Sequence, residues 1–310
     1  MVGSAGGSSP SAVVVVGSVN VDYVFQVLRR PAAGETVTEA VLAVLAGGKG
    51  ANQAAAAALC GASVSLLGRV GDDALGQARR VELTSLGVDT SLVGVTPGAM
   101  TGVAFITVTP DGENAIVVAP GANITLSPVD ADNAQDAIGG ASVLVAQLEV
   151  PVAVVARAAE IAPRDTPLVL NAAPVRDLPA SLLKRVDVLV VNEHEAGQIV
   201  GQSVIETRDA MEATSKLLAL GPTAVVITLG PEGAVLAEGE TRQHVPAPPA
   251  KVVDTTGAGD AFVGALAAKL AASATLAEAM RYAVGVGTAT VGYSGAEPHI
   301  PAANSDPFGN

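Results

Sequence analysis

The chain has 310 residues, of which 49% are hydrophobic, 15% charged and 2% aromatic, and its net charge at pH 7 is −13. This size and composition fit a globular protein with a large core, built either as one large α/β domain or as two smaller ones. The acidic balance argues against an interface with the phosphate backbone of a nucleic acid, and the scarcity of aromatic residues argues against a surface for stacking bases.

The sequence carries no sign of secretion or of a membrane anchor. Residues 1–12 are rich in Gly and Ser and lack the basic region of a signal peptide, so we expect a disordered leader. No apolar run of about 18 residues free of turn formers occurs. The one cysteine, Cys60, allows neither an intrachain disulfide nor a cysteine metal cluster. We expect it to be a small buried hydrophobe in a cytoplasmic protein.

Short apolar runs alternate with helical patterns along the chain. The runs predict buried strands at Val13–Val16, Ser63–Gly68, Ser142–Ala146, Pro167–Leu170, Val186–Val191 and Ala224–Thr228. Helices are predicted near residues 50–60, 73–86, 151–162, 207–219, 258–272 and 275–291. This alternation is typical of βαβ units, which predicts an α/β fold with a mainly parallel sheet and ligands at the carboxyl ends of its strands.

Two stretches, Tyr23–Ala46 and Thr101–Val118, show strand-like alternation without long helices. The second contains Pro110-Asp-Gly between two apolar halves, a pattern that predicts a β-hairpin. Together the stretches predict a small accessory sheet that could act as a lid. Because no linker divides the chain, we expect one main domain with the lid inserted in it.

The most informative motif is Asp254-Thr-Thr-Gly-Ala-Gly-Asp260, which follows a short strand-like run, Lys251–Val253, and opens a long apolar helix. The first N–H groups of a helix have no partners within it and, with the helix dipole, bind anions. Asp260 could then take a proton from a hydroxyl group while these N–H groups stabilise a phosphoryl group in transfer. The alternative is a Gly-rich turn in which Asp260 only caps the helix.

Three further motifs place polar side chains at strand ends, where a small polyol could bind. Gly47-Gly-Lys-Gly-Ala-Asn52 is not a P-loop but offers glycines for close approach and the Asn52 amide. Its alternative is an ordinary strand-to-helix loop with a solvated Lys49. Gly17-Ser-Val-Asn-Val-Asp22 offers Asn20 and Asp22, or forms only a turn. Gln147-Leu-Glu149 offers one carboxylate, which would otherwise be solvated.

Two motifs suit a nucleotide and its metal ion. Asn192-Glu-His-Glu195 follows a strand and could hold a hydrated Mg2+, which keeps several waters and uses few protein ligands. Alternatively, Asn192 caps a helix and Glu195 lies in its first turn. Glu193 and His194 are assigned to the surface. Thr228-Leu-Gly-Pro-Glu-Gly233 could hold phosphates and ribose of a nucleotide, or simply join two strands.

In this order, the motifs resemble those of the PfkB family, the ribokinase-like carbohydrate kinases, from about Ala12 to Pro301. The hallmark signatures are the runs that begin at Gly47 and Asp254, and they are supported by Gly34-Glu-Thr-Val, Gly71-Asp-Asp-Ala-Leu-Gly, Gly121-Ala-Asn and Asn171-Ala-Ala-Pro. The resemblance implies a three-layer αβα sandwich around the parallel sheet. It implies a kinase domain at residues 13–303, with a lid at about 23–46 and 101–118 and a tail at 304–310.

The resemblance also implies roles for residues. Asp260 would be the general base, and Gly257, Ala258 and Gly259 would form the anion hole for the γ-phosphoryl group. The sugar would be held by Asn20, Asp22, Gly48, Lys49, Asn52, Glu149 and Asp260. The ATP site would comprise Asn192, Thr228, Leu229, Gly230, Pro231, Glu232, Gly233, Gly259, Asp260 and Val284.

Two metal ions are implied as well. Glu195 would act on Mg2+ through water. An activating K+ would be held by Asp254, Thr256, Thr290, Tyr293, Gly295 and His299. Three positions depart from the family pattern: Val284 cannot make the usual polar contact with the nucleotide, His299 stands where a small hydroxyl residue is usual, and Ala46 replaces a bulkier residue near the sugar pocket.

The implied reaction is ATP-dependent phosphorylation of D-ribose at O5, which gives D-ribose 5-phosphate and ADP. Other kinases of the family, acting on 2-deoxyribose, fructose or a nucleoside, remain alternatives, although the polar residues favour a small polyol. A sugar-binding protein without catalysis is a further alternative, against which the intact Asp260 argues. Because exposed lid strands would otherwise present free edges, we expect a homodimer formed through the lid sheet, with no nucleic-acid or membrane partner.

Overall fold

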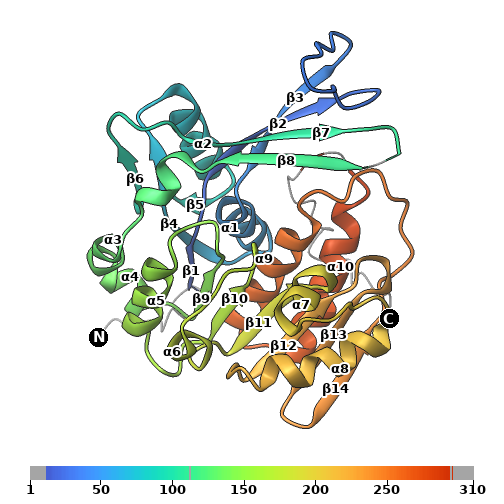
Figure 1. The fold of residues 1–310 in the computed structure, drawn as a ribbon. Coiled ribbons are helices and arrows are strands. Elements are labelled where there is room, and N and C mark those ends of the chain that lie inside the picture. The colour runs from blue at the N-terminus through green and yellow to red at the C-terminus, as the bar shows by residue number, and fades with distance from the viewer. Residues whose placement is uncertain (1–11, 112, 294, 296–310) are drawn as a thin grey trace, which may run out of the picture.

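The computed structural model describes residues 12–111, 113–293 and 295. A ten-stranded sheet runs through it in the order β14-β13-β12-β11-β10-β9-β1-β4-β5, with β6 paired to the C-terminal part of β4 (Figure 1). Its strands are β1 (Ala12–Val16), β4 (Ser63–Gly71), β5 (Val88–Asp89), β6 (Val93–Thr96), β9 (Val143–Ala146), β10 (Leu168–Asn171), β11 (Val188–Asn192), β12 (Ala224–Thr228), β13 (Ala234–Glu238) and β14 (Thr241–Val245). Only the pairs made by β13 are antiparallel, so the predicted α/β fold with a mainly parallel sheet is confirmed.

The sequence of β1 explains why the sheet is buried on both faces. Val13 and Val15 belong to one hydrophobic cluster and Val14 and Val16 to another, and all four are at most 2% exposed. Successive side chains of a strand point to opposite faces, so an unbroken valine run supplies both cores at once.

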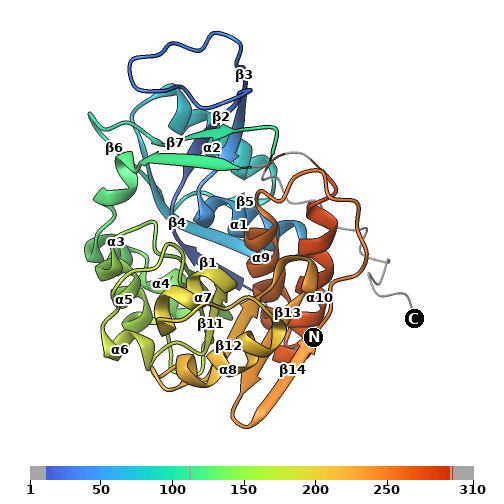
Figure 2. The same cartoon turned by 45° about the vertical axis from the view of Figure 1, so that its right-hand side comes forward.

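Helices cover both faces of this sheet (Figures 1 and 2). The layer against the Val13 cluster consists of α1 (Lys49–Leu59), α2 (Ala74–Ser85), α9 (Ala258–Ala271) and α10 (Leu276–Thr290). The layer against the Val14 cluster consists of α3 (Pro128–Asn133), α4 (Gln135–Gly139), α5 (Val152–Ile161), α6 (Ala180–Leu183), α7 (Glu193–Val200) and α8 (Thr207–Leu218). The expected three-layer αβα arrangement is therefore present.

A separate four-stranded sheet has the order β3-β2-β7-β8 and stands apart from the main sheet (Figure 2). Its strands are β2 (Asn20–Gln26), β3 (Val41–Gly47), β7 (Gly102–Val108) and β8 (Asn114–Ala119). The last two strands pair antiparallel, which confirms the predicted hairpin. Asn20 opens β2 opposite both Gly47 and Gly102, so the small sheet begins three residues before the expected boundary at Tyr23. The sheet therefore carries Asn20 and Asp22 at its base.

Three local predictions are wrong. The leader was expected to include Ala12, which instead begins β1; the rest of the leader and the expected tail at 304–310 lie outside the described residues. The run Lys251–Val253 is irregular, and the Val253 N–H donates to the carbonyl of Val291, just after α10. Cys60 is only partly buried, at the end of α1, where burial raises the pKa of its thiol to about 11.

No helix in the described part of the chain combines the length and the apolar character that crossing a bilayer requires.

Candidate functional site

The start of α9 places Asp260 in the interior of the protein. The residue that caps the helix, Gly257, has a φ of 76°, a left-handed conformation that glycine adopts without strain. The Ala261 N–H donates to the Gly257 carbonyl at 2.8 Å, so helical bonding begins there and leaves the N–H groups of Gly259 and Asp260 without intrahelical partners. The Ala258 N–H donates within the preceding turn, at 3.3 Å. The remaining N–H groups and the helix dipole make this end an anion-binding position.

Two side chains of α1 hold the Asp260 carboxylate. Asn52 Nδ2 donates to its Oδ2 at 3.2 Å, and Gln53 Nε2 donates to its Oδ1 at 2.9 Å. Gln53 also donates to Asn171 Oδ1 at 3.1 Å and accepts a bond from Gln147 Nε2 at 2.7 Å. All of these side chains are buried, so the carboxylate is fixed in place. The sequence pointed to Asn52 and missed Gln53, whose one signal was a polar residue within an alanine run.

Lys49 faces the same carboxylate. The negative charge of Asp260 is the largest cause that raises the pKa of Lys49. Burial raises the pKa of Asp260 above its ordinary value, and the charge of Lys49 and the hydrogen bond from Gln53 oppose that rise. The alternative of a solvated Lys49 is therefore wrong, because its side chain is partly buried beside Asp260. A carboxyl group with a raised pKa is suited to accept a proton near neutral pH.

Asp22 lies against the glycine loop that precedes α1. A Cβ atom on Gly47 would come within 2.0 Å of Asp22 Oδ1, and one on Gly48 within 2.6 Å of the Asn20 backbone nitrogen. Gly48 also has a φ of 90°, so its position requires glycine, whereas a side chain at Gly47 would displace the Asp22 carboxylate. The predicted sugar-site residues of β2 therefore meet the predicted loop. The pKa of Asp22 is raised to about 7, chiefly by burial and secondly by the negative charge of Glu149.

Glu149 is hydrogen-bonded rather than solvated. Its Oε2 accepts bonds from Ser18 Oγ at 2.5 Å and from the Lys49 N–H at 3.0 Å. Ser18 Oγ in turn accepts from the Gly50 N–H at 3.3 Å. The carboxylate thus joins the loop after β1 to the start of α1. No pattern in the sequence pointed to Ser18, since a serine in such a loop is ordinary.

A cavity of about 200 Å³ opens beside Lys49 and Asp260, and its lining does not include the other predicted sugar-site residues, Asn20, Asp22, Gly48, Asn52 and Glu149. It is lined by Lys49, Asn171, Ala173, Val190, Val191, Asn192, Glu195, Thr228, Gly257, Gly259, Asp260 and Val263. It lies between the carboxyl ends of β10, β11 and β12 and the start of α9, where ligands of parallel sheets bind. A larger hollow of about 750 Å³, between α2 and β6, contains none of the predicted site residues. We therefore place the site at the smaller cavity.

Asn192 and Glu195 cap the start of α7. Asn192 Oδ1 accepts from the Glu195 N–H at 2.8 Å, and Glu195 Oε2 accepts from the Asn192 N–H at 2.9 Å. The helix-cap alternative is therefore confirmed. Both residues also line the cavity, and burial raises the pKa of Glu195. A single carboxylate beside a polar cavity fits a hydrated Mg2+, so that role stays a prediction.

The segment from Thr228 to Gly233 joins β12 to β13 through a short 3₁₀ turn, η2 (Gly230–Glu232), which confirms the strand-joining alternative. Thr228 lines the cavity, and the Leu229 N–H donates to the Gly233 carbonyl at 2.8 Å. The contact of this segment with a nucleotide stays a prediction.

Two loops meet at Asp254. Its Oδ1 accepts from the Thr256 N–H and its Oδ2 from the Gly295 N–H, both at 2.9 Å. Burial raises the pKa of Asp254, but these hydrogen bonds bring it below the ordinary value, so a negative charge is held where the loops join. This arrangement fits a monovalent cation, and three of its expected ligands lie together.

Four further residues were expected to contact the nucleotide or the monovalent cation. Val284 is 4% exposed and packs in the hydrophobic cluster of α9 and α10. Thr290 is buried, and its Oγ1 donates to a carbonyl one turn back in α10 at 3.0 Å. Tyr293 is half exposed. His299 lies outside the described residues. These four assignments stay predictions.

Comparison with known proteins decides the family. A family model described as pfkB family carbohydrate kinase matches residues 11–303. The chain belongs to this family. The ribokinase of Staphylococcus aureus is 39% identical to this pfkB kinase over 292 residues, which cover 93% of the chain and 96% of that protein. The deoxyribokinase of Salmonella typhimurium is 35% identical over 293 residues, which cover 94% and 95%.

The fold is also similar to that of a solved ribokinase structure. The structure of Arabidopsis thaliana ribokinase complexed with ribose and ATP is 32% identical to this pfkB kinase, with a TM-score of 0.87 over 95% of the chain and 96% of that structure. The main sheet and the separate small sheet are therefore those of a ribokinase-like fold. As a pfkB carbohydrate kinase, the protein is a phosphotransferase.

Proposed function

We propose that this pfkB kinase phosphorylates D-ribose at O5 with ATP and gives D-ribose 5-phosphate and ADP. One observation carries the proposal. Asp260 is buried at the N-terminus of α9, lines a polar cavity, and accepts hydrogen bonds from Asn52 and Gln53. A base and an anion-binding helix end in one place suit phosphoryl transfer to a hydroxyl group. The similarity to ribokinases supports ribose as the acceptor.

In the proposed reaction, Asp260 accepts the proton of the primary hydroxyl of the sugar. The hydroxyl oxygen attacks the γ-phosphorus of ATP in line as the bond to the leaving ADP breaks. The N–H groups of Gly259 and Asp260 stabilise charge on the phosphoryl oxygens. Glu195 would hold Mg2+ through water, and the ion would neutralise charge on the phosphates. The loops that meet at Asp254 would hold K+, next to the anion-binding turn.

The small sheet is proposed to serve as the lid of the sugar site. Asp22 shares a face of this sheet with Leu45, Ala104 and Val118, since these residues are paired across the four strands. This face carries the carboxylate that lies against Gly47. Closure of the lid over the sugar would exclude water and limit loss of ATP to hydrolysis.

The opposite face of the lid sheet supports a homodimer. Val44, Tyr23, Phe105 and Val117 pair in one row across all four strands, and the rings of Tyr23 and Phe105 stack at 5.4 Å. Val44, Phe105 and Val117 are 44–68% exposed. A contiguous apolar face of this kind is typical of an interaction surface, so we propose that two copies pair through it.

An assay of ADP release tests the proposed activity. Mg-ATP is combined with ribose, 2-deoxyribose, fructose, adenosine or no acceptor, each with K+ or with Na+. We expect ribose to give the highest kcat/KM and K+ to raise the rate. A preference for 2-deoxyribose would reassign the substrate and keep the kinase mechanism. Absence of turnover with every acceptor would overturn the proposed function.

A further inference from the structure

Asn123 is a buried amide whose orientation is dictated by the backbone. It lies in the 3₁₀ turn η1 (Gly121–Thr125) and is 1% exposed. Its Oδ1 accepts from the Val19 N–H at 2.9 Å, and its Nδ2 donates to the carbonyls of Val19 at 3.2 Å and Pro120 at 3.0 Å. A backbone N–H can only donate and a carbonyl can only accept, so the reversed amide would face three mismatched groups.

The same Nδ2 determines the orientation of Asn20. It donates to Asn20 Oδ1 at 2.7 Å, so the Asn20 oxygen faces Asn123 and the Asn20 Nδ2 must point the other way. No hydrogen bond between described residues uses that Nδ2 as donor, and it is not among the buried polar atoms that lack a partner. The donor therefore reaches accessible space at the base of the lid.

We propose that Asn123 is a positioning residue, which fixes Asn20 as a hydrogen-bond donor toward the sugar and so selects a sugar oxygen that accepts there. The inference rests on the proposed function, because the ligand of Asn20 is taken to be the sugar. It assigns to Asn123 a part in sugar recognition although its own side chain faces the protein.

The start of β7 packs closely against both amides. A Cβ atom on Gly102 would lie 2.1 Å from Asn20 Oδ1 and 2.3 Å from Asn123 Nδ2, so the start of β7 closes over both amides. No larger residue could take the place of Gly102 without displacing them.

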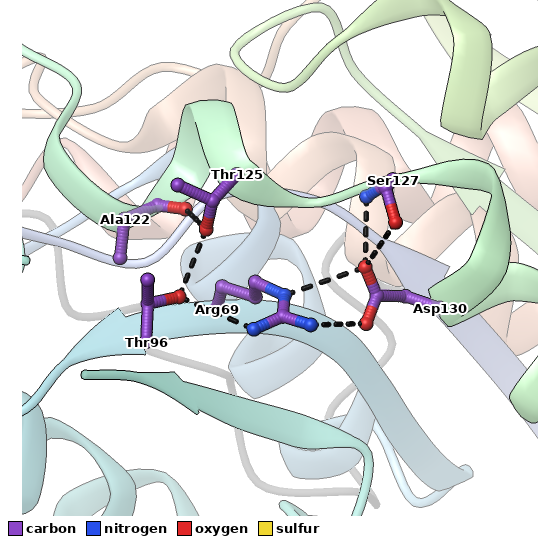
Figure 3. A network of polar contacts seen from close by, with 6 residues as sticks. All are labelled: Arg69, Thr96, Ala122, Thr125, Ser127 and Asp130. Atoms are coloured by element: carbon purple, nitrogen blue, oxygen red, sulfur yellow. Dashed lines mark hydrogen bonds and ion pairs between the residues drawn. The ribbon is translucent and has the colours of Figure 1, made fainter.

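A polar network anchors η1 itself (Figure 3). Thr125 Oγ1 donates to the Ala122 carbonyl at 2.7 Å and shares a hydrogen bond with Thr96 Oγ1 at 2.8 Å. Arg69 bonds both Thr96 and Asp130, at the start of α3. The turn that carries Asn123 is therefore tied to β6 and α3 and cannot rotate freely.

The test begins with Asn123→Asp. The new oxygen faces two carbonyls and Asn20 Oδ1, and a reversed Asn20 amide, donating to the new carboxylate, relieves the contact with Asn20. The oxygen of Asn20 would then face the sugar. We expect the KM for ribose to rise about tenfold or more, the cost of one mismatched hydrogen bond, with kcat and the KM for ATP little changed. The matched control, Asn133→Asp on the exposed end of α3, should leave all three constants unchanged.

A double-mutant cycle with Asn20→Ala separates positioning from general support. Once Asn20 lacks an amide, Asn123→Asp should raise the KM for ribose no further. An equal rise of the KM for ribose in both backgrounds, or no rise of it in the wild-type background, would overturn the positioning role of Asn123. Neither result would affect the proposed kinase activity. If Asn20→Ala leaves the KM for ribose unchanged, the proposed sugar site itself is wrong. Should Asn123→Asp fail to fold, Asn123→Ser enters the same cycle, with an expected rise of about threefold because a hydroxyl can accept or donate.

Discussion

At the scale of single residues, hydrogen bonds of fixed direction organise the site. Gln53 illustrates this, since its amide group donates to Asp260 and Asn171 and accepts from Gln147. A donor aimed at a carboxylate favours the charged form and lowers its pKa. Gln53 would therefore keep Asp260 available as the proposed base, although burial alone would favour the protonated form of its carboxyl group.

The variant Gln53→Met should raise the pKa of Asp260 further, because it removes a donor to the carboxylate. We expect the acidic limb of the kcat–pH profile to move to higher pH and kcat at pH 7 to fall about tenfold. Gln77→Met, on the exposed face of α2, is the matched control. An unmoved pH profile would contradict the role given to Gln53, even if the variant is less stable.

Asp22 makes the stability of the protein depend on pH. Its pKa is raised from 3.8 to about 7, so the folded protein keeps a proton that the unfolded chain releases. The free energy of unfolding should therefore fall as pH rises between these two values. Asp22→Asn avoids this loss because its side chain does not titrate. We expect the free energy of unfolding of this variant to exceed that of the wild type by on the order of 2 kcal/mol at pH 8 and to differ little from it at pH 4. Urea unfolding at both pH values measures the effect, and an equal difference at both would argue against it.

The candidate site could be predicted only where a residue belongs to a local motif. Asp260, Asn52 and the loop glycines were found from their neighbours in sequence. The role of Gln53 was missed because its contact with Asp260 spans 207 positions in the chain, and that of Asn123 because its contact with Asn20 spans 103. Such pairings depend on the fold and leave no trace in the spacing of residues.

At the scale of elements, the contact between α1 and α9 sets the position of Asp260. A Cβ atom on Gly264 would lie 2.5 Å from both the Ala56 Cβ and the Gln53 carbonyl oxygen, so glycine allows the two helices to approach closely. Gly264 lies one turn after Asp260 in α9. The same contact therefore brings Asp260 to Asn52 and Gln53.

Gly264→Ala should push α9 away from α1. We expect the free energy of unfolding to fall by about 1–3 kcal/mol, as in other overpacked cores, and kcat to fall because Asp260 moves from its donors. Gly139→Ala in α4 is the control, since a Cβ atom there meets nothing within 4 Å. Calorimetry and steady-state kinetics on both variants measure the two effects. Unchanged stability in Gly264→Ala would show that the helices can separate without cost.

Elements with a strong apolar pattern were predictable, and those without one were not. β1 is marked by an unbroken valine run, and the Ala-rich pattern of α9 extends over 14 residues. The short helix α6 has four residues and β5 has two, too few for a pattern to appear. The β13–β14 hairpin was missed because its second strand, Thr241–Val245, is mostly polar and so gives no apolar run beside Ala234–Glu238.

At the scale of the whole molecule, we propose that the lid sheet gives one face to the sugar site and the other to a second copy of the chain. The register of the sheet makes this division, since Asp22 and Tyr23 are neighbours in β2 and point to opposite faces. The proposed dimer would therefore stiffen the lid from its outer side. Sugar binding and pairing of subunits would then be linked through the same four strands.

Val117→Lys places a charge in the outer row of β8. We expect it to convert a dimer to a monomer, because a buried unpaired ammonium group is costly. Light scattering after size-exclusion chromatography measures the mass. Ile205→Lys, at an 81% exposed apolar residue outside the lid, is the matched control and should stay dimeric. A wild-type protein that is monomeric at all concentrations would refute the proposed pairing.

The most direct test of the account concerns Asp260. Asp260→Asn keeps the shape of the side chain and removes its capacity to accept a proton. Steady-state ADP release with saturating ribose and Mg-ATP should show a kcat lower by about 10² or more, the usual contribution of a general base, while ribose binding and Tm stay close to those of the wild type. A variant that turns over near the wild-type rate would show that Asp260 is not the base and that the mechanism proposed for this cavity is wrong.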